Sequence, residues 1–361
     1  MIRKSLMLKG CVLLTVMSLF LTACAKTEKN EVVQPEKVQK MQEIVDTQEK
    51  QSIQEEQNLQ TEQDIQAEPE VQTDQEEPYV PTVNINPDAR EDWGTASLSG
   101  SLEAYEDYFK LDMKEYTRKC ENAGKIETIT YYSESWGAER SAQVYTPYGF
   151  TVVKEYPVIY LIHGIGCDST QWVSMGVQNM FDNMIANGEL EPFIAVFPSV
   201  IPTGGLDPNT LSDINIQAFV TFVEEFEKDL HPYINKYYHA SKDRENIAIC
   251  GLSMGGMEAL RVGFTYPETF NYIGSFSAAP TLELELLTTK NREYVPELVL
   301  LCSGDKDGTV GDNPFNYHSE LSRNGVEHIW YVHPKEGHSP TVWNLGLFNF
   351  LKRLSGGFLA K

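Results

Sequence analysis

Short apolar runs recur from residue 157 onward, and each ends at a glycine, a proline or a small polar residue. They read "PVIYLIHG" at 157–164, "PFIAVFPS" at 192–199, "NIAICGLS" at 246–253, "ELVLLCSGDKD" at 297–307 and "HIWYVHP" at 328–334. Runs of this length that are rich in β-branched residues are typical of strands buried on both faces, as in a parallel sheet. We therefore predict five strands of one buried sheet.

Segments with helical spacing separate these runs. The predicted helices cover residues 177–188, 214–238, 255–267, 316–325 and 339–354. Upstream, the segments 126–135 and 140–147 predict an antiparallel pair at one edge of the sheet. Strands that alternate with helices indicate an α/β layered fold with a mostly parallel sheet, whose active site lies at the carboxyl ends of the strands.

The first ninety residues differ from the rest of the chain. They are poor in aromatic residues and glycine, and residues 24–90 carry much of the formal net charge of −23 in a Gln/Glu-rich, low-complexity sequence. We interpret 24–90 as a disordered acidic tether, because its apolar spacing is too irregular for the alternative, a short coiled coil. A lead-in segment at 91–125 and a catalytic domain at 126–361 complete the prediction. No basic patch indicates a nucleic-acid partner.

The chain begins with the features of an export signal. Basic residues precede an apolar run, which ends in Leu-Thr-Ala-Cys24. This ending resembles the lipobox of bacterial lipoproteins. The resemblance implies that residues 1–23 are removed, that Cys24 carries diacylglycerol, and that a lipid bilayer holds the protein at the cell surface, outside the cytoplasm. A soluble secreted protein is the alternative.

Four cysteines remain after the predicted lipidation site: Cys120, Cys167, Cys250 and Cys302. Cys250 and Cys302 end apolar runs, so we predict that they act as small hydrophobic residues. The cysteine spacing does not match a metal site, and the predicted chemistry requires no cofactor. The sequence leaves open whether Cys120 or Cys167 forms a disulfide, and it leaves the oligomeric state open.

The strongest chemical signal is "GLSMGG", in which Ser253 lies between a predicted strand and a predicted helix. In the pattern Gly-x-Ser-x-Gly, the tight turn exposes the serine hydroxyl above the sheet, and the glycines avoid collisions with the neighbouring strand and helix. The pattern alone is weak, but its position between strand and helix favours a nucleophile.

A nucleophilic serine needs a histidine base that is oriented by a carboxylate, in the chain order Ser, acid, His. After the next strand, "CSGDKDG" supplies Asp307, which we prefer to Asp305, because Asp305 begins the turn; Asp312 is a remote third candidate. After the last strand, "YVHPKEGHSP" supplies His338 on a loop, which we prefer to His333 at the strand end.

Two backbone amides must stabilise the negative charge that develops on the carbonyl oxygen during attack. One is the amide of Met254, the residue after the nucleophile. The loop "HGIG" after the first buried strand supplies the other, and we assign it to Ile165. We interpret His163, in the same loop, as structural.

Four motifs together resemble the esterase D-like α/β-hydrolases, in particular the feruloyl and acetyl-xylan carbohydrate esterases attached to bacterial xylanases. They are "YLIHGIGCDSTQW", "DRENIAICGLSMGGMEAL", "CSGDKD" and "EGHSPTVWNLGLFNFL". The resemblance implies an α/β-hydrolase fold with helices on both faces of the sheet, and a Ser253, His338, Asp307 triad. It also places Trp172 and Trp343 where such enzymes line the pocket for the acyl group or the sugar, with core packing as the alternative for each. Glu336 and Ser339-Pro340 depart from the family pattern beside the pocket, which affects acyl specificity more than catalysis.

We therefore expect a serine esterase that cleaves a feruloyl or acetyl ester of a plant polysaccharide or of its oligosaccharides. The same fold also hosts acyltransferases and esterases of lipids or siderophores. A catalytically inactive, glycan-binding lipoprotein is the alternative from a different class. The acyl group and the sugar are not determined by the sequence.

Overall fold

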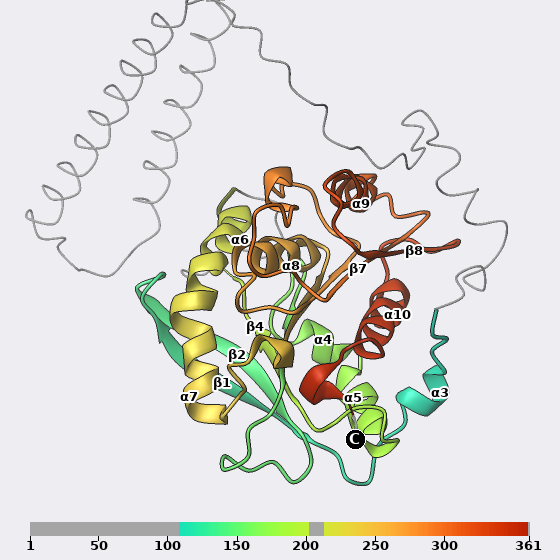
Figure 1. The fold of residues 1–361 in the computed structure, drawn as a ribbon. Helices are drawn as coiled ribbons and strands as arrows, with labels where there is room; N and C mark the ends of the chain where they lie inside the picture. The colour runs from blue at the N-terminus through green and yellow to red at the C-terminus, as the bar shows by residue number, and fades with distance from the viewer. Residues whose placement is uncertain (1–107, 202–212, 360–361) are drawn as a thin grey trace, which may run out of the picture. The chain divides into compact units, whose positions relative to one another are not determined.

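The computed structural model describes residues 108–201 and 213–359, and within them an eight-stranded sheet forms the centre of the molecule (Figure 1). The strands are β1 Lys125–Ser133, β2 Ala138–Thr146, β3 Val158–Ile162, β4 Ile194–Pro198, β5 Ile247–Leu252, β6 Tyr272–Phe276, β7 Leu298–Gly304 and β8 Ile329–His333. Their order is β1-β2-β4-β3-β5-β6-β7-β8. β2 is antiparallel to both of its neighbours, β1 and β4, and the six strands β3 to β8 run parallel to one another. The predicted parallel sheet and its antiparallel edge pair are confirmed.

The strand β6 was not predicted, although it pairs with β5 on one side and with β7 on the other. Its sequence is only five residues long and contains Gly274, which weakens the β-branched signal of a strand. A Cβ at Gly274 would lie 2.8 Å from the Cβ of Cys250 on β5. Gly274 makes β6 difficult to recognise in the sequence, and it also allows β6 to pack closely against β5.

Helices cover both faces of the sheet (Figure 1). They are α3 Met113–Tyr116, α4 Gln171–Ser174, α5 Val177–Ala186, α6 Asp213–Glu225, α7 His231–Tyr238, α8 Met254–Thr265, α9 Asn313–Arg323 and α10 Pro340–Leu351. Buried side chains of α6, α7, α8 and α9 form one apolar core, and those of α4, α5 and α10 form the other. Because β3, β4 and β5 are buried along their whole length, the sheet separates two cores.

The single helix that we predicted at 214–238 is wrong in its middle. α6 passes into a π-helical segment, Phe226–Leu230, before α7 begins at His231. Phe226 and Leu230 are fully buried there. Inserting a residue into the helical repeat turns the next apolar face toward the core, and the apolar pattern alone does not reveal such an insertion.

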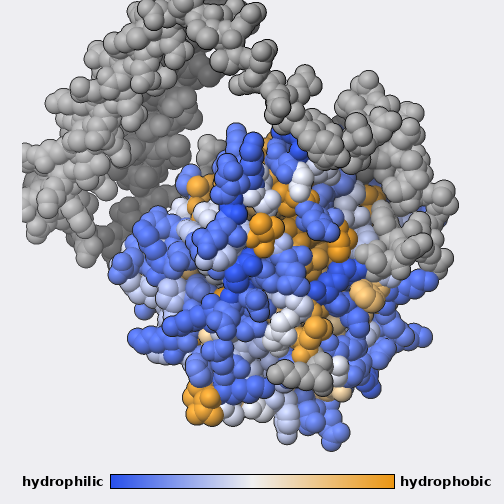
Figure 2. All heavy atoms as spheres, in the orientation of Figure 1, coloured by the Kyte–Doolittle hydropathy of each residue, from blue (hydrophilic) through white to orange (hydrophobic). Residues whose placement is uncertain are grey.

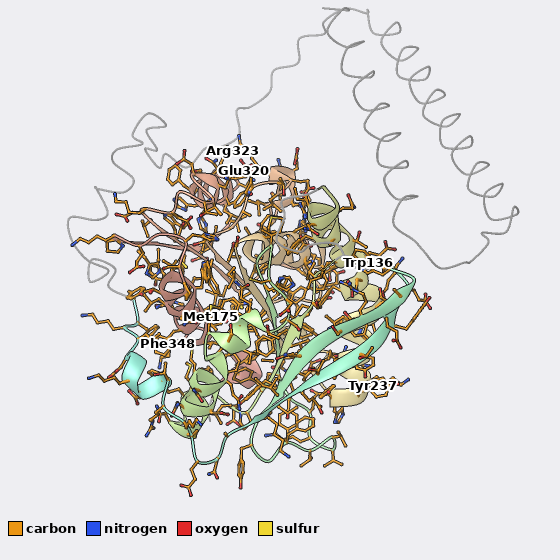
Figure 3. All side chains as sticks on the ribbon, turned by 180° about the vertical axis from the view of Figure 1, so that it is seen from behind. Trp136, Met175, Tyr237, Glu320, Arg323 and Phe348 are labelled. Carbon is orange, nitrogen blue, oxygen red and sulfur yellow. The ribbon has the colours of Figure 1, made fainter. Side chains whose placement is uncertain are left out.

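The end of the lead-in segment packs against α10. The Phe109 amide donates to Asn349 Oδ1, the Asn349 side-chain amide donates to the Phe109 carbonyl, and both distances are 2.9 Å. The rings of Tyr116 in α3 and Phe348 in α10 lie 4.8 Å apart, and Figure 3 shows Phe348 beside α3. The predicted signal peptide at 1–23, Cys24 and the tether at 24–90 lie outside the described residues.

On the face drawn in Figure 2, polar residues cover most of the surface of the described residues, and apolar residues appear in separate patches. No helix within 108–201 or 213–359 is long and apolar enough to cross a membrane.

Candidate active site

Ser253 lies in the turn between β5 and α8, in a backbone conformation that few residues other than glycine adopt. Its φ is 56° and its ψ is −123°. A Cβ at Gly251 would lie 2.1 Å from the Gly255 carbonyl oxygen, and a Cβ at Gly255 would lie 2.3 Å from the Ile162 carbonyl oxygen. Both positions therefore require glycine, because backbone atoms cannot move aside as a flexible side chain can. The strained, tightly packed turn is the geometry that the pattern predicted.

Asp307 follows β7 and His338 follows β8, and their side chains meet beyond the carboxyl ends of these strands. His338 Nδ1 lies 2.9 Å from Asp307 Oδ2 and 3.1 Å from Oδ1. The Asp307 side chain is 1% exposed and that of His338 is 17% exposed. The structure therefore brings together the preferred acid and the preferred histidine.

Asp307 remains ionised in spite of its burial. Burial alone would raise the pKa of its carboxyl group, but the hydrogen bond and the charge of His338, together with further hydrogen bonds such as that from the Val310 amide, outweigh burial, and the pKa lies below its ordinary value. The amides of Thr309 and Val310 also donate to Asp307 Oδ1, at 3.2 and 3.3 Å. An ionised carboxylate accepts the Nδ1 proton of His338 and leaves Nε2 free to act as a base.

The alternative candidates have other contacts. The amide of Asp305 donates to the His333 carbonyl, and the nearest cation to its carboxylate is Lys306, at 3.9 Å. His333 is fully buried, and burial lowers its pKa to about 4. His318 and His328 bond to each other at 2.7 Å.

The loop after β3 is held on both sides of Gly164. Its amide donates to Gln171 Oε1 at 2.8 Å, and its carbonyl accepts from His163 Nδ1 at 2.7 Å. His163 Nε2 in turn accepts from the Val200 amide at 2.8 Å. Burial lowers the pKa of His163 to about 4, so that the ring is neutral and structural, as we expected.

These bonds leave two amides available. Among the described residues, neither the Ile165 amide nor the Met254 amide donates to a carbonyl or a side chain. Met254 begins α8, so its amide belongs to the first turn, where helical N–H groups lack partners and the helix dipole favours negative charge. These are the two amides that the sequence pointed to.

The two predicted pocket tryptophans lie in different surroundings. The prediction for Trp172 is wrong: the residue is 1% exposed, its Nε1 donates to the Ile162 carbonyl at 3.0 Å, and its ring packs edge-on against Phe276 in the core. Trp343 lies next to the histidine instead, with ring centroids 5.0 Å apart and an interplanar angle of 82° to His338. Its Nε1 is buried without a partner.

Sequence reasoning missed Gln171, because only the folded loop shows that its side chain bonds to Gly164. All four cysteines of the described residues are free, and Cys250 and Cys302 are buried as predicted. Within the same ranges, no group of three or more acidic, histidine or cysteine side chains could hold a metal ion.

Comparison with known families identifies the fold. A model of the Esterase family, described as "Putative esterase", matches residues 133–335, which is more than half of the chain. The chain belongs to the Esterase family. It has the α/β-hydrolase fold that we predicted, and the family is one of carboxylic ester hydrolases.

Two curated relatives of this esterase are xylanases. The chain is 38% identical over 206 residues to an endo-1,4-beta-xylanase/feruloyl esterase of Xylanibacter ruminicola, which covers 54% of this chain and 27% of the relative. It is 35% identical over 154 residues to endo-1,4-beta-xylanase Y of Acetivibrio thermocellus, covering 39% of this chain and 13% of the relative. The chain therefore spans about a quarter or less of the length of these relatives.

Among solved structures, the esterase is similar to a CE1 ferulic acid esterase of the anaerobic fungus Anaeromyces mucronatus. The TM-score is 0.62 at 28% identity, covering 68% of this chain and 96% of the fungal chain.

Proposed function

We propose that this protein is a serine esterase that hydrolyses feruloyl or acetyl esters of plant polysaccharides or oligosaccharides, with Ser253, His338 and Asp307 as its catalytic triad. The observation that carries the proposal is the hydrogen bond between His338 Nδ1 and the buried Asp307 carboxylate, at the sheet edge where Ser253 occupies its strained turn. The arrangement supplies a nucleophile, a base and an orienting acid in the chain order of this fold.

In the first half of the reaction, Ser253 Oγ attacks the ester carbonyl carbon while His338 Nε2 takes the hydroxyl proton. The negative charge on the carbonyl oxygen is stabilised by the amides of Ile165 and Met254, which have no protein acceptor among the described residues. Asp307 stabilises the imidazolium. The C–O bond of the ester then breaks, the sugar hydroxyl leaves with the proton from His338, and the acyl group remains on Ser253.

In the second half, water replaces the sugar hydroxyl. His338 Nε2 takes a proton from the water, the hydroxide attacks the acyl carbon, and the same two amides stabilise the second oxyanion. The bond to Ser253 Oγ breaks, and Ser253 recovers its proton from His338. The released product is the carboxylic acid.

The proposed substrate class rests on two observations. A curated relative that is 38% identical over 206 residues is named endo-1,4-beta-xylanase/feruloyl esterase, and the similar fungal structure is a ferulic acid esterase. Trp343 packs against His338 and so lies beside the reacting centre, where the 7% of its surface that is exposed can contact a hydroxycinnamoyl ring or a sugar.

The proposed location is the bacterial cell surface, with Cys24 acylated in a lipid bilayer. This proposal rests on the lipobox-like sequence before Cys24. We expect radiolabelled palmitate to be incorporated into the full chain, and Cys24→Ala to abolish the incorporation. Equal labelling of the Cys24→Ala variant would refute the anchor.

The central experiment measures hydrolysis of methyl ferulate, feruloylated arabinoxylan oligosaccharides and acetylated xylan. We expect release of ferulate or acetate by the native protein, and a loss of roughly 10⁵-fold or more in Ser253→Ala. The half-buried Ser322 of α9 offers a control, and Ser322→Ala should retain full activity. Equal activity of Ser253→Ala and the native protein would refute the nucleophile, and inactivity of the native protein on all three esters would refute the substrate class.

A further inference from the structure

The loop that follows β6 is held in a strained conformation beside Ser253. We refer to residues 277–283 as the β6 loop. Two of its residues other than glycine have positive φ angles, 48° at Ser277 and 87° at Thr281. Each such residue costs on the order of 1–3 kcal/mol and persists only where the surroundings hold it in place. The contacts of the β6 loop with its surroundings must therefore offset this cost.

The β6 loop touches the nucleophile through the backbone. The Ala279 amide donates to the Ser253 carbonyl oxygen at 3.0 Å. The same oxygen accepts from the amides of Gly256 and Met257, at 3.0 and 3.1 Å. Three donors thus fix the direction of one carbonyl group.

The direction of this carbonyl determines the direction of the Met254 amide. The Ser253 carbonyl and the Met254 N–H belong to one planar trans peptide, so they point in opposite directions. A donor that pulls the carbonyl toward the β6 loop consequently aims the Met254 N–H away from it. Under the proposed function, this N–H is one of the two oxyanion donors, and the alignment of such donors governs the rate of the chemical step.

Arg261, two turns after the start of α8, binds residues of the β6 loop. Its Nη2 donates to the Thr281 carbonyl at 2.7 Å, its Nε lies 2.9 Å from Glu283 Oε2, and its Nη1 lies 2.8 Å from Glu258 Oε2. Arg261 is 5% exposed and Glu258 is fully buried. The rigid fork of the guanidinium group binds three partners at once, which lysine cannot reproduce.

Tyr317 of α9 provides a second support. Its hydroxyl donates to the Ala279 carbonyl at 2.6 Å, and its side chain is buried. Ala279 is therefore held at its carbonyl by Tyr317 while its amide holds Ser253.

We infer that Arg261 is a positioning residue for the oxyanion hole: through Thr281 and the β6 loop it places the Ala279 amide, which orients the Ser253–Met254 peptide. The inference rests on the proposed role of the Met254 amide. Arg261 is 5% exposed and acts through the β6 loop, so its removal should change kcat more than KM.

The test compares Arg261→Met with the native protein on methyl ferulate. We expect kcat to fall about 10-fold with KM within a factor of two, because misaligning one donor forfeits part of the 10²- to 10³-fold contribution of a complete donor. We also expect the inhibition constant of an aryl trifluoromethyl ketone, which forms an oxyanion on the serine, to rise by a similar factor. Arg261→Lys should restore only a small part of either change.

Arg244 offers a matched control. It also fastens backbone, since it donates to the carbonyls of Pro267, Phe270 and Val295, but it does not contact the β6 loop. Arg244→Met should lower the melting temperature and leave kcat and the inhibition constant unchanged. Equal losses of kcat in Arg261→Met and Arg244→Met would overturn the inference, because they would indicate general destabilisation.

Tyr317→Phe tests the same path if Arg261→Met fails to fold. This variant removes only the hydroxyl that holds Ala279, and we expect a smaller fall in kcat, about threefold, with KM unchanged. An unchanged kcat and inhibition constant in folded Arg261→Met, or in Tyr317→Phe where Arg261→Met does not fold, would refute the inference. The proposed function is refuted separately, by hydrolysis that survives in Ser253→Ala.

Discussion

The two halves of the candidate site are held in place by different kinds of contact. Around Ser253, backbone packs against backbone, and glycine is required because carbonyl oxygens occupy the space that a Cβ would fill. Around Asp307 and His338 the backbone is also tightly packed, since a Cβ at Gly304 would lie 2.2 Å from the Glu336 carbonyl oxygen, but the contact that joins the acid to the base is between side chains. We refer to these halves as the elbow side and the acid side. Backbone packing fixes the position of Ser253 on the elbow side, whereas the acid side also depends on a hydrogen bond between two side chains.

Among variants that retain Ser253, the largest effect should come from Asp307→Asn on the acid side. The Thr309 and Val310 amides would keep the oxygen of the new amide, and its NH₂ group would face His338 Nδ1. A donor at this place favours the tautomer with the proton on Nε2, which cannot act as a base, so we expect kcat to fall about 10⁴-fold.

Asp305→Asn is the control for this prediction, because the Asp305 carboxylate has no bond to His338. We expect its kcat to stay within about threefold of the native value, since no charge next to the histidine is lost. Both variants should show native circular dichroism. A larger loss in Asp305→Asn than in Asp307→Asn would reverse the assignment of the acid.

The elbow side should respond in stability. In Gly255→Ala the new Cβ would lie 2.3 Å from the Ile162 carbonyl oxygen and 2.5 Å from that of His163, so strand β3 and helix α8 would have to separate. We expect the free energy of unfolding in urea to fall by about 3 kcal/mol.

Gly308→Ala provides the matched comparison on the acid side. Because its surroundings are open and its φ is not positive, we expect a change within about 0.5 kcal/mol. Similar losses in both variants would break the distinction between backbone packing on one side and side-chain contact on the other.

Much of this contrast was predictable from the sequence, because the elbow side is encoded locally. Gly251, Ser253 and Gly255 lie within five residues, and the apolar run before them predicts the strand on which the turn depends. On the acid side, the sequence favoured Asp307 over Asp305, because Asp305 begins the turn, and His338 over His333, because His333 lies at the strand end. The structure confirms the Asp307–His338 contact.

Contacts between distant segments were beyond the reach of sequence reasoning. Arg261 reads as an ordinary helical arginine, although it is buried against the β6 loop. The resemblance to the esterases placed Trp172 at the pocket, and the single-turn helix α4 is too short for its apolar spacing to show that this residue faces the core. The short strand β6 was hidden by Gly274 for a related reason: the pairing partners, not local composition, stabilise it.

Gln171→Met should reduce activity without a large loss of stability. Removing Gln171 Oε1 leaves the Gly164 amide without its acceptor and loosens the loop that presents the Ile165 amide. We expect kcat on methyl ferulate to fall about 10-fold, since one oxyanion donor is then less well aligned.

Gln178 of α5 is the control for Gln171, because its side chain also bonds backbone, the Gly124 carbonyl at 2.9 Å, on a different loop. Gln178→Met should leave kcat unchanged. A kcat in Gln171→Met equal to the native value would show that His163 alone holds the loop, and that the elbow side tolerates the loss of a side-chain contact better than the acid side does.

The responses of the two sides to pH should have opposite signs. Behind the elbow, burial raises the pKa of Glu258 to about 8, so the folded protein binds a proton that the unfolded chain releases near its ordinary pKa of 4.5. The contribution of Glu258 to stability therefore falls as the pH rises from about 4.5 to 8. On the acid side, the lowered pKa of Asp307 gives a contribution to stability that is present above its ordinary value of 3.8 and is lost as the pH falls below it.

In urea unfolding followed from pH 3 to 8.5, Glu258→Gln should flatten the neutral limb of the stability curve and leave the acid limb, whereas Asp307→Asn should do the reverse. A Glu258→Gln curve parallel to that of the native protein between pH 5 and 8 would show that Arg261 keeps this carboxylate ionised, and the elbow side would then resemble the acid side in resting on an ion pair.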